Sequence, residues 1–292
     1  MGIESYEQLA LRRSESALEE GALIPLSTCK IPLDGNDQFE LRELTSSLPK
    51  HFRQAGPQPN PFCPWDRRLE VSLIGAHHAL ILNKYPVQLG HMLLITKDWA
   101  SQRDWLESSD WIAVSKVDAV TTGLWFFNSG PLAGASQPHR HLQLLPRQTD
   151  EARCPREQWF CNLLNDPCGN TVPVPPVEAA TAVRPRNPEH RDQAEHLAEL
   201  YSSLAMELQL GVPGRENAPQ APYNVLLTDH WMAMVRRCSD GVHGFSVNAL
   251  GFAGYLLATE KGDRDWLLTN GPERLLAEVV DPFRATTDDG SS

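Results

Sequence analysis

The sequence predicts an α+β protein with a mainly antiparallel sheet. Short runs rich in Val, Ile, Leu and aromatic residues follow one another with few residues between them, which is typical of neighbouring antiparallel strands. The helical patterns stand apart from these runs instead of alternating with each of them. The clearest hairpin joins 223–228 to 231–235, because only two residues separate the two apolar runs.

Residues 1–128 predict two helices and four strands. A polar segment that contains Leu and Ala predicts a surface helix near the N-terminus, and the stretch 56–66, with its four prolines, predicts a loop. The expected elements are a helix at 4–20, strands at 69–75, 79–83, 91–96 and 124–128, and a helix within 106–123.

A second proline-rich stretch, 167–188, predicts a linker or an extended crossing segment. Beyond it, residues 189–210 place apolar side chains at i, i+3, i+4, i+7 and i+11, which is the spacing of one helix face. We therefore expect an N-terminal part at 1–166 that contains the catalytic core, the linker at 167–188, and a C-terminal part at 189–292 that completes the substrate site.

The composition predicts an acidic globular protein of the cytoplasm. The 292 residues carry a formal net charge of −11, which does not attract a phosphate backbone or an anionic membrane, so we expect neither nucleic acid nor membrane as a partner. The N-terminus has early acidic residues and no apolar core, unlike a signal peptide. The six cysteines form no C-x-x-C pair, so free thiols and no protein-bound metal are expected.

The most informative pattern is a polar row, His139, His141 and Gln143, with one residue between each pair. On a strand, side chains at i, i+2 and i+4 share one face. Leu142 and Leu144 fall on the opposite face and suit a core. The polar row is therefore expected to face a ligand.

A glycine-rich loop leads into this strand. Gly130, Gly134, Ala135 and Ser136 are small, which allows successive backbone N–H groups to converge on an anion. An anion site beside imidazoles fits attack of a neutral imidazole on phosphorus, or a metal site at the two histidines. The metal site has no carboxylate or cysteine on the same strand. A pair of hydrogen-bonded structural histidines is the third interpretation, and the spacing alone leaves all three open.

The segment GASQPHRHLQ resembles the active-site strand of the histidine-triad (HIT) superfamily, in the branch whose last triad histidine is glutamine. The longer string NSG-x-x-x-GASQPH-x-HLQ resembles the family of diadenosine tetraphosphate (Ap4A) phosphorylases, also called ATP adenylyltransferases. NPFCPW, LILNKYPVQLGHMLLIT, YNVLLTDHWMAMVRR and NALGFAG resemble other family blocks in the same order, so the likeness runs from about 60 to 258. It implies a HIT-like antiparallel sheet with packed helices and a C-terminal elaboration.

The resemblance also implies an activity and a set of site residues. His141 would be the nucleophile that takes AMP from Ap4A and releases ATP; phosphate would then remove the AMP as ADP, and the reverse reaction would make Ap4A. His139 would orient the polar face, and Gln143 would donate its amide to the transferred phosphate. The implied substrate-binding residues are Lys50, Asn83, Lys84, Asn128, Gly134, Ala135, Ser136, Gln137, Thr228, Arg236 and Arg237.

Glutamine at position 143 makes chemical sense for this reaction. An amide forms hydrogen bonds but does not exchange a proton near neutral pH, whereas histidine does. ATP leaves without strong acid assistance, and phosphate is already anionic, so neither step needs a proton carrier at Gln143. Lys84 and Arg237 would neutralise charge on the polyphosphate.

Two other functions remain open at this point. A hexose-1-phosphate uridylyltransferase shares the HxHxQ pattern, and a nucleotide-binding protein without activity would keep the fold. For the main hypothesis we expect nucleotides and phosphate as the only partners, Mg²⁺ bound with the nucleotide, no tightly bound cofactor, and a monomer or dimer. Outside this site, His91 is expected to be structural, and His77 and His78 to be solvated in a turn.

Overall fold

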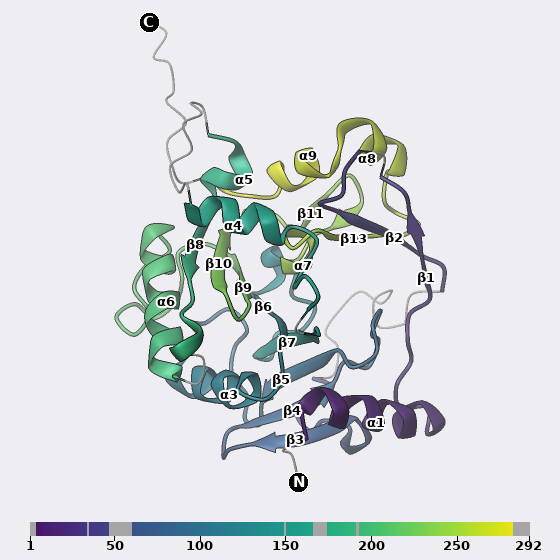
Figure 1. Cartoon of the computed structure of the whole chain (residues 1–292), viewed down its shortest axis with the longest axis vertical. Coiled ribbons are helices and arrows are strands. Elements are labelled where there is room, and N and C mark those ends of the chain that lie inside the picture. Colours follow the sequence, from purple (N-terminus) through teal and green to yellow (C-terminus); the bar gives the residue numbers. More distant parts are fainter. Residues whose placement is uncertain are drawn as a thin grey trace, which may run out of the picture.

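The computed structural model describes residues 4–33, 35–46, 60–148, 150–165, 174–190 and 193–282. Its centre is an eight-stranded sheet (Figure 1). The strands are β3 (Glu70–Ile74), β4 (His78–Leu82), β5 (Met92–Thr96), β6 (Gly123–Asn128), β7 (His141–Pro146), β8 (Thr181–Pro185), β9 (Tyr223–Leu227) and β10 (Trp231–Arg236). Their order is β3-β4-β5-β7-β6-β9-β10-β8, and every neighbouring pair is antiparallel. The predicted α+β class with an antiparallel sheet is confirmed.

The helices cover both faces of this sheet. They are α1 (Tyr6–Glu19), α3 (Ser108–Asp118), α4 (Glu157–Asn165), α5 (Pro176–Ala179), α6 (Ala194–Glu207), α7 (Ala249–Phe252), α8 (Arg264–Asn270) and α9 (Pro272–Ala277), with 3₁₀ turns η1 (Arg67–Leu69), η2 (Pro131–Ala133) and η3 (Pro188–His190). The first helix begins where its sequence dictates, because Ser5 and Gln8 form a capping box.

Side chains of the central strands alternate between two apolar clusters. Leu94, Leu142 and Leu144 point to the face that α1, α3 and α6 cover. Phe126 and Leu145 point to the other face, where α4, α7, α8 and α9 provide the apolar partners. The polar row of β7 shares this second face.

A smaller three-stranded sheet joins the two ends of the chain. It contains β1 (Thr28–Ile31), β2 (Glu40–Leu44) and β13 (Tyr255–Ala258), and β13 lies parallel to β2 (Figure 1). A short hairpin, β11 (Gly241–Val242) and β12 (Phe245–Ser246), stands beside it. The sequence analysis predicted none of these strands. The side chains of β1 and β2 are largely polar and half-buried, β13 is only four residues long, and β11 and β12 have two residues each.

The stretch 167–188 is structured in its second half. Its residues up to 173 lie outside the described ranges, and the remainder forms α5, β8 and η3. The edge strand β8 pairs with β10, and β9 pairs with β6, so the large sheet runs through both predicted parts of the chain. The division at 166 and 189 stays a prediction.

The prediction for His78 was wrong. Its side chain is buried on the α3 side of the sheet, where Nε2 lies 2.8 Å from Asp110 Oδ1. Arg140 donates to Asp110 Oδ2 at 3.0 Å, so the carboxylate links His78 of β4 to Arg140, the residue before β7. The turn spans residues 75–77 instead of 76–78, so β4 already begins at His78, and of the two histidines only His77 is exposed. In the described ranges, no helix combines the length and apolar character that a bilayer crossing requires.

Candidate functional site

The polar row lies at the centre of the large sheet, with His141 and Gln143 on β7, and the neighbouring strand β6 ends at Asn128. Leu142 packs into the opposite face, so His141 and Gln143 share the face with the C-terminal helices. Phe126 of β6 pairs with Gln143, and continuing this register by two residues places Asn128 opposite His141. His141, Gln143 and Asn128 therefore share one face of the sheet with the apolar side chains of Phe126 and Leu145.

Two apolar clusters border this row on the same face. One is formed near β4 and β5 by Phe62, Ala79, Ile81, Leu93 and Ile95. The other lies on the β6 and β9 side and includes Leu124, Phe126, Leu145 and Leu226. Phe62 reaches the row itself, with its ring centroid 5.2 Å from that of His141. The polar groups therefore stand in surroundings that hold little water.

The imidazole of His141 is held in one tautomer. Its Nδ1 lies 2.7 Å from the backbone carbonyl oxygen of His139, which only accepts hydrogen bonds, so Nδ1 carries the proton. Nε2 then keeps its lone pair. The residue is 4% exposed, and burial lowers the pKa of His141 to about 4. His141 is therefore a neutral imidazole with a free basic nitrogen at physiological pH.

Both ring nitrogens of His139 are engaged by the protein. The backbone N–H of Phe62 donates to Asn60 Oδ1 at 3.0 Å, so the Asn60 amide Nδ2 donates to His139 Nδ1 at 2.9 Å. His139 Nε2 donates to the Thr96 carbonyl at 2.9 Å. Burial lowers the pKa of His139. This side chain offers no lone pair to a substrate or a metal, and its contribution to the row is the carbonyl that orients His141.

Gln143 is linked to His91 and Asn83. Its Oε1 lies 3.0 Å from His91 Nε2, and His91 Nδ1 lies 3.0 Å from Asn83 Nδ2. Burial lowers the pKa of His91 to about 4. The structure therefore brings two predicted residues, Asn83 and Gln143, to the site together with a histidine that the sequence analysis set apart as structural.

Asn128 is anchored in a second network. Its Oδ1 accepts from Asn224 Nδ2 at 2.8 Å and from the Ala249 backbone N–H at 2.9 Å. Asn224 Oδ1 in turn accepts from Arg237 Nη1 at 2.6 Å. Because the oxygen of Asn128 is occupied twice, its amide N–H groups remain to donate.

Arg237 is not free to face a polyphosphate. Its guanidinium is completely buried and also donates to the carbonyls of Ser239, Val247 and Val279. These acceptors, together with Asn224 Oδ1, hold the guanidinium within the fold, and a contact of Arg237 with the substrate stays a prediction.

The ends of β6 and β7 are joined by the side chain of Gln102. Its Oε1 accepts the His141 backbone N–H at 2.8 Å, and its Nε2 donates to the carbonyls of Asn128 at 2.7 Å and His141 at 3.2 Å. The buried amide replaces the backbone ladder where the two strands separate. Gln102 therefore fixes the relative position of the two residues that stand opposite each other.

The glycine-rich loop between β6 and β7 presents backbone donors. Gly134 has φ +86, and a Cβ there would lie 2.7 Å from Asn248 Cβ and Val247 O, so only glycine fits. The N–H of Ala135 is used within the loop, by Gly130 O. In the described part of the chain, no hydrogen bond uses the backbone N–H of Ser136 or Gln137. These two successive groups suit an anion.

The remaining predicted residues do not join the row. Lys84 is exposed and lies over the Tyr85 ring, and Lys50 lies outside the described residues. Thr228 caps the β9–β10 turn by accepting from the N–H groups of His230 and Trp231. It is four residues from Asn224, about 13 Å along the strand at roughly 3.3 Å per residue. Arg236 pairs with Asp281 at 2.7 Å.

Sequence reasoning missed three residues that build the site. His91, Gln102 and Asn60 each act through side-chain hydrogen bonds to the row or to the strand that carries it. Only Asn60 and His91 lay in family-like blocks, and no spacing pattern marked Gln102.

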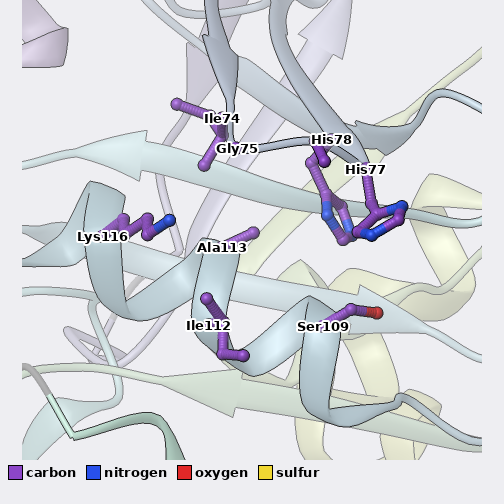
Figure 2. A pocket seen from close by; sticks show the side chains of 9 residues that line it. Ile74, Gly75, His77, His78, Ser109, Ile112, Ala113 and Lys116 are labelled. Carbon is purple, nitrogen blue, oxygen red and sulfur yellow. The ribbon is translucent and has the colours of Figure 1, made fainter.

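A separate pocket lies at the edge of the sheet, between the β3–β4 turn and α3. Figure 2 shows His77 and His78 on one side and Lys116 on the other. It contains none of the predicted site residues, and we assign it no role. Among the described residues, no three His, Cys, Asp or Glu side chains cluster as a metal site would need.

Two family models match the chain. The "Ap4A phosphorylase N-terminal domain" matches residues 4–161, and the "ATP adenylyltransferase C-terminal domain" matches residues 154–282. Diadenosine 5',5'''-P1,P4-tetraphosphate phosphorylase 2 of Saccharomyces cerevisiae is 33% identical over 229 residues, 69% of each chain. Protein APA1 of the same organism is 30% identical over 216 residues, 67% of this chain and 65% of the relative.

Solved structures agree on the fold. The crystal structure of yeast Ap4A phosphorylase Apa2 matches with a TM-score of 0.73 at 24% identity, covering 100% of both chains. The same protein in complex with Ap4A matches with a TM-score of 0.70, over 97% of this chain and 99% of that chain. Because a family model spans more than half of the sequence, the chain belongs to the Ap4A phosphorylase family, as the motifs around His141 predicted.

Proposed function

We propose that this protein catalyses the phosphorolysis of Ap4A to ATP and ADP, and the reverse reaction, through an adenylyl-histidine. His141 Nε2 attacks the phosphorus of one AMP unit; a P–N bond forms, the P–O bond to the bridging oxygen breaks, and ATP leaves. An oxygen of phosphate then attacks the same phosphorus, the P–N bond breaks, and ADP leaves. The names of the yeast relatives support this substrate.

One observation carries the proposal: the His139 carbonyl holds the proton of His141 on Nδ1. A nucleophilic imidazole needs a lone pair on the attacking nitrogen and a neutral ring, and here the hydrogen bond supplies the first and burial the second. When the P–N bond forms, the ring becomes cationic, and the same carbonyl stabilises the charge on Nδ1–H.

The neighbouring donors suit the charge that develops on the transferred phosphoryl group. Asn128 is linked to His141 through Gln102, and in the part of the chain that the structure describes no hydrogen bond uses its amide N–H groups. Ser136 and Gln137 offer backbone N–H groups from the loop. Preorganised donors stabilise such a group because they need no reorientation when the charge develops. None of these groups takes up a proton near pH 7, which favours anionic phosphate over water as acceptor.

We further propose that Mg²⁺ enters with the polyphosphate, whose oxygens are the hard ligands this ion prefers. A cytoplasmic location is supported by the cysteines, because all five that are described are free thiols. We propose that phosphate is the second substrate. We also propose that the protein is a monomer or a dimer, and light scattering measures this oligomeric state.

The test is to incubate the protein with Ap4A and Mg²⁺, with and without phosphate, and to resolve the nucleotides. We expect ATP and ADP in equal amounts, only when phosphate is present. UDP-glucose with galactose 1-phosphate serves as the control for the uridylyltransferase hypothesis. Turnover of that pair without turnover of Ap4A would overturn the proposal, and so would binding of Ap4A with no products.

A further inference from the structure

An amide at position 143 helps catalysis only in one of its two orientations. When Nε2 faces the substrate, Gln143 donates a hydrogen bond to a phosphoryl oxygen. When Oε1 faces the substrate, the amide oxygen and the phosphoryl oxygen repel each other because both carry partial negative charge. In the described part of the chain, the only hydrogen bond of the Gln143 side chain is the one to His91. The orientation of Gln143 therefore depends on whether His91 donates or accepts.

A backbone group decides this question. The N–H of Tyr85 can only donate, and it lies 3.2 Å from Asn83 Oδ1, so the Asn83 oxygen is the acceptor there. The Asn83 Nδ2 group must then face His91, to whose Nδ1 it donates at 3.0 Å. The direction of each hydrogen bond is fixed by the one before it.

The His91 imidazole determines the direction of the next hydrogen bond, to Gln143. His91 is buried and neutral, so it carries a single proton, and because Nδ1 accepts from Asn83 the proton is on Nε2. Nε2–H therefore donates to Gln143 Oε1 at 3.0 Å. The Gln143 oxygen is occupied on the side of β5, which leaves its amide N–H groups for the substrate.

The sheet makes this relay rigid. Asn83 and His91 extend the β4–β5 hairpin, with the N–H of Asn83 bonded to the His91 carbonyl at 2.8 Å. Leu93, two residues further along β5, pairs directly with Gln143. The His91 ring also packs on Phe126, with centroids 5.8 Å apart. A rotation of the His91 ring would lose its hydrogen bonds to Asn83 and Gln143 and its packing on Phe126.

We propose that His91 is a positioning residue of the transfer reaction, which fixes the Gln143 amide with its N–H groups toward the transferred phosphoryl group, in a direction set by Asn83 and the Tyr85 backbone. This role rests on the proposed function, which it deepens, and it requires no contact between His91 and the substrate.

The experiment is a double-mutant cycle between His91→Leu and Gln143→Ala, read as kcat and KM of Ap4A phosphorolysis. His91→Leu removes the donor, so we expect kcat to fall roughly ten- to hundred-fold, the range for a misdirected hydrogen bond to a charged group, with KM changed less than about threefold. In the Gln143→Ala background the same substitution is expected to change kcat less than about threefold.

Three further variants separate positioning from packing. His91→Gln places an amide nitrogen near the former Nε2 and is expected to restore most of kcat. His77→Leu, in the exposed turn between β3 and β4, is the control and is expected to match the wild type. His91→Met, which also lacks the donor, replaces His91→Leu if thermal unfolding shows that the leucine variant does not fold.

The outcomes are distinct. An equal loss from His91→Leu in both backgrounds, or a His91→Gln variant as slow as His91→Leu, would show that His91 only supports the fold and would overturn the inference. Wild-type protein that produces no ATP and ADP would refute the proposed function instead, before the cycle is run.

Discussion

The hydrogen bonds around His141 and Gln143 start from groups whose roles are fixed. The His139 carbonyl only accepts, and the backbone N–H groups of Tyr85 and Ala249 only donate. Imidazoles and amides, which can do either, lie between these fixed groups and the substrate side. Backbone geometry therefore decides which nitrogen is basic and which amide edge faces the phosphate.

Changing Gln143 to histidine is expected to alter the choice of acceptor. A Gln143→His variant places a group with a pKa near neutrality beside the reacting phosphorus, where it can assist water. Hydrolysis to AMP and ATP should rise relative to phosphorolysis, measured as the ratio of AMP to ADP with and without phosphate. Gln143→Ala is the control and should slow both reactions. An unchanged ratio in the histidine variant would show that exclusion of water sets the acceptor.

The position of the loop between β6 and β7 depends on the close contact of Gly134 with Val247 and Asn248. Gly134 lies against the backbone of Asn248, the residue that caps α7, and the next N–H in that helix holds Asn128. The position of the loop and the orientation of Asn128 are therefore coupled.

This coupling predicts that Gly134→Ala is far more harmful than a glycine change elsewhere. Gly214 has a similar φ of +80 but nothing within 4 Å of a Cβ, so Gly214→Ala should cost only the strain of a left-handed residue, about 1–2 kcal/mol. Gly134→Ala adds the clash and should lower Tm further and reduce kcat/KM at least about tenfold. Thermal unfolding and steady-state kinetics compare the pair. Equal behaviour of the two variants would argue against the coupling.

The central strands and α6 could be predicted because each carries a strong pattern of its own. The row at 139–143 alternates over a buried strand, and 223–235 reads as a hairpin, so both were placed correctly. β2 was missed because its only buried side chain is Leu41, and its partner β13 is distant in the sequence. Gln102 was missed for a similar reason: a single amide gains its role only when two strand ends meet it.

The roles of arginine were the least predictable. Sequence gives the charge of Arg237 but not whether the guanidinium faces solvent or carbonyls, and four acceptors from separate segments decide this only in the folded chain. The resemblance implies that Thr228 contacts the substrate, which stays a prediction; in the structure its hydroxyl accepts hydrogen bonds within the β9–β10 turn.

The whole molecule places neutral histidines at the centre of its sheet. His91 and His141 both have a pKa of about 4 in the folded protein, against about 6.5 in the unfolded chain. The unfolded chain therefore binds more protons between these values. The contribution of these two histidines to the free energy of unfolding is fully present above about pH 6.5. It decreases as the pH is lowered and does not decrease further below about pH 4.

This linkage predicts a measurable slope. Each histidine should contribute up to about 1.4 kcal/mol per pH unit to the loss of unfolding free energy between pH 6 and 4.5. Urea unfolding at several pH values measures it, and His91→Leu should remove the part of the slope that comes from His91. A wild type and a His91→Leu variant that lose stability in parallel would mean that the His91 imidazole is not buried as a neutral group.

The adenylyl-histidine itself is the most direct test of this account. Wild-type protein incubated with Ap4A and no phosphate should gain one AMP by intact-mass spectrometry, acid-labile and mapped to His141, and adding phosphate should release it as ADP. His141→Ala should gain none and lose about three orders of magnitude in rate. An adduct on His139, or turnover of the wild type with no adduct under any condition, would contradict the assignment of His141 as the nucleophile.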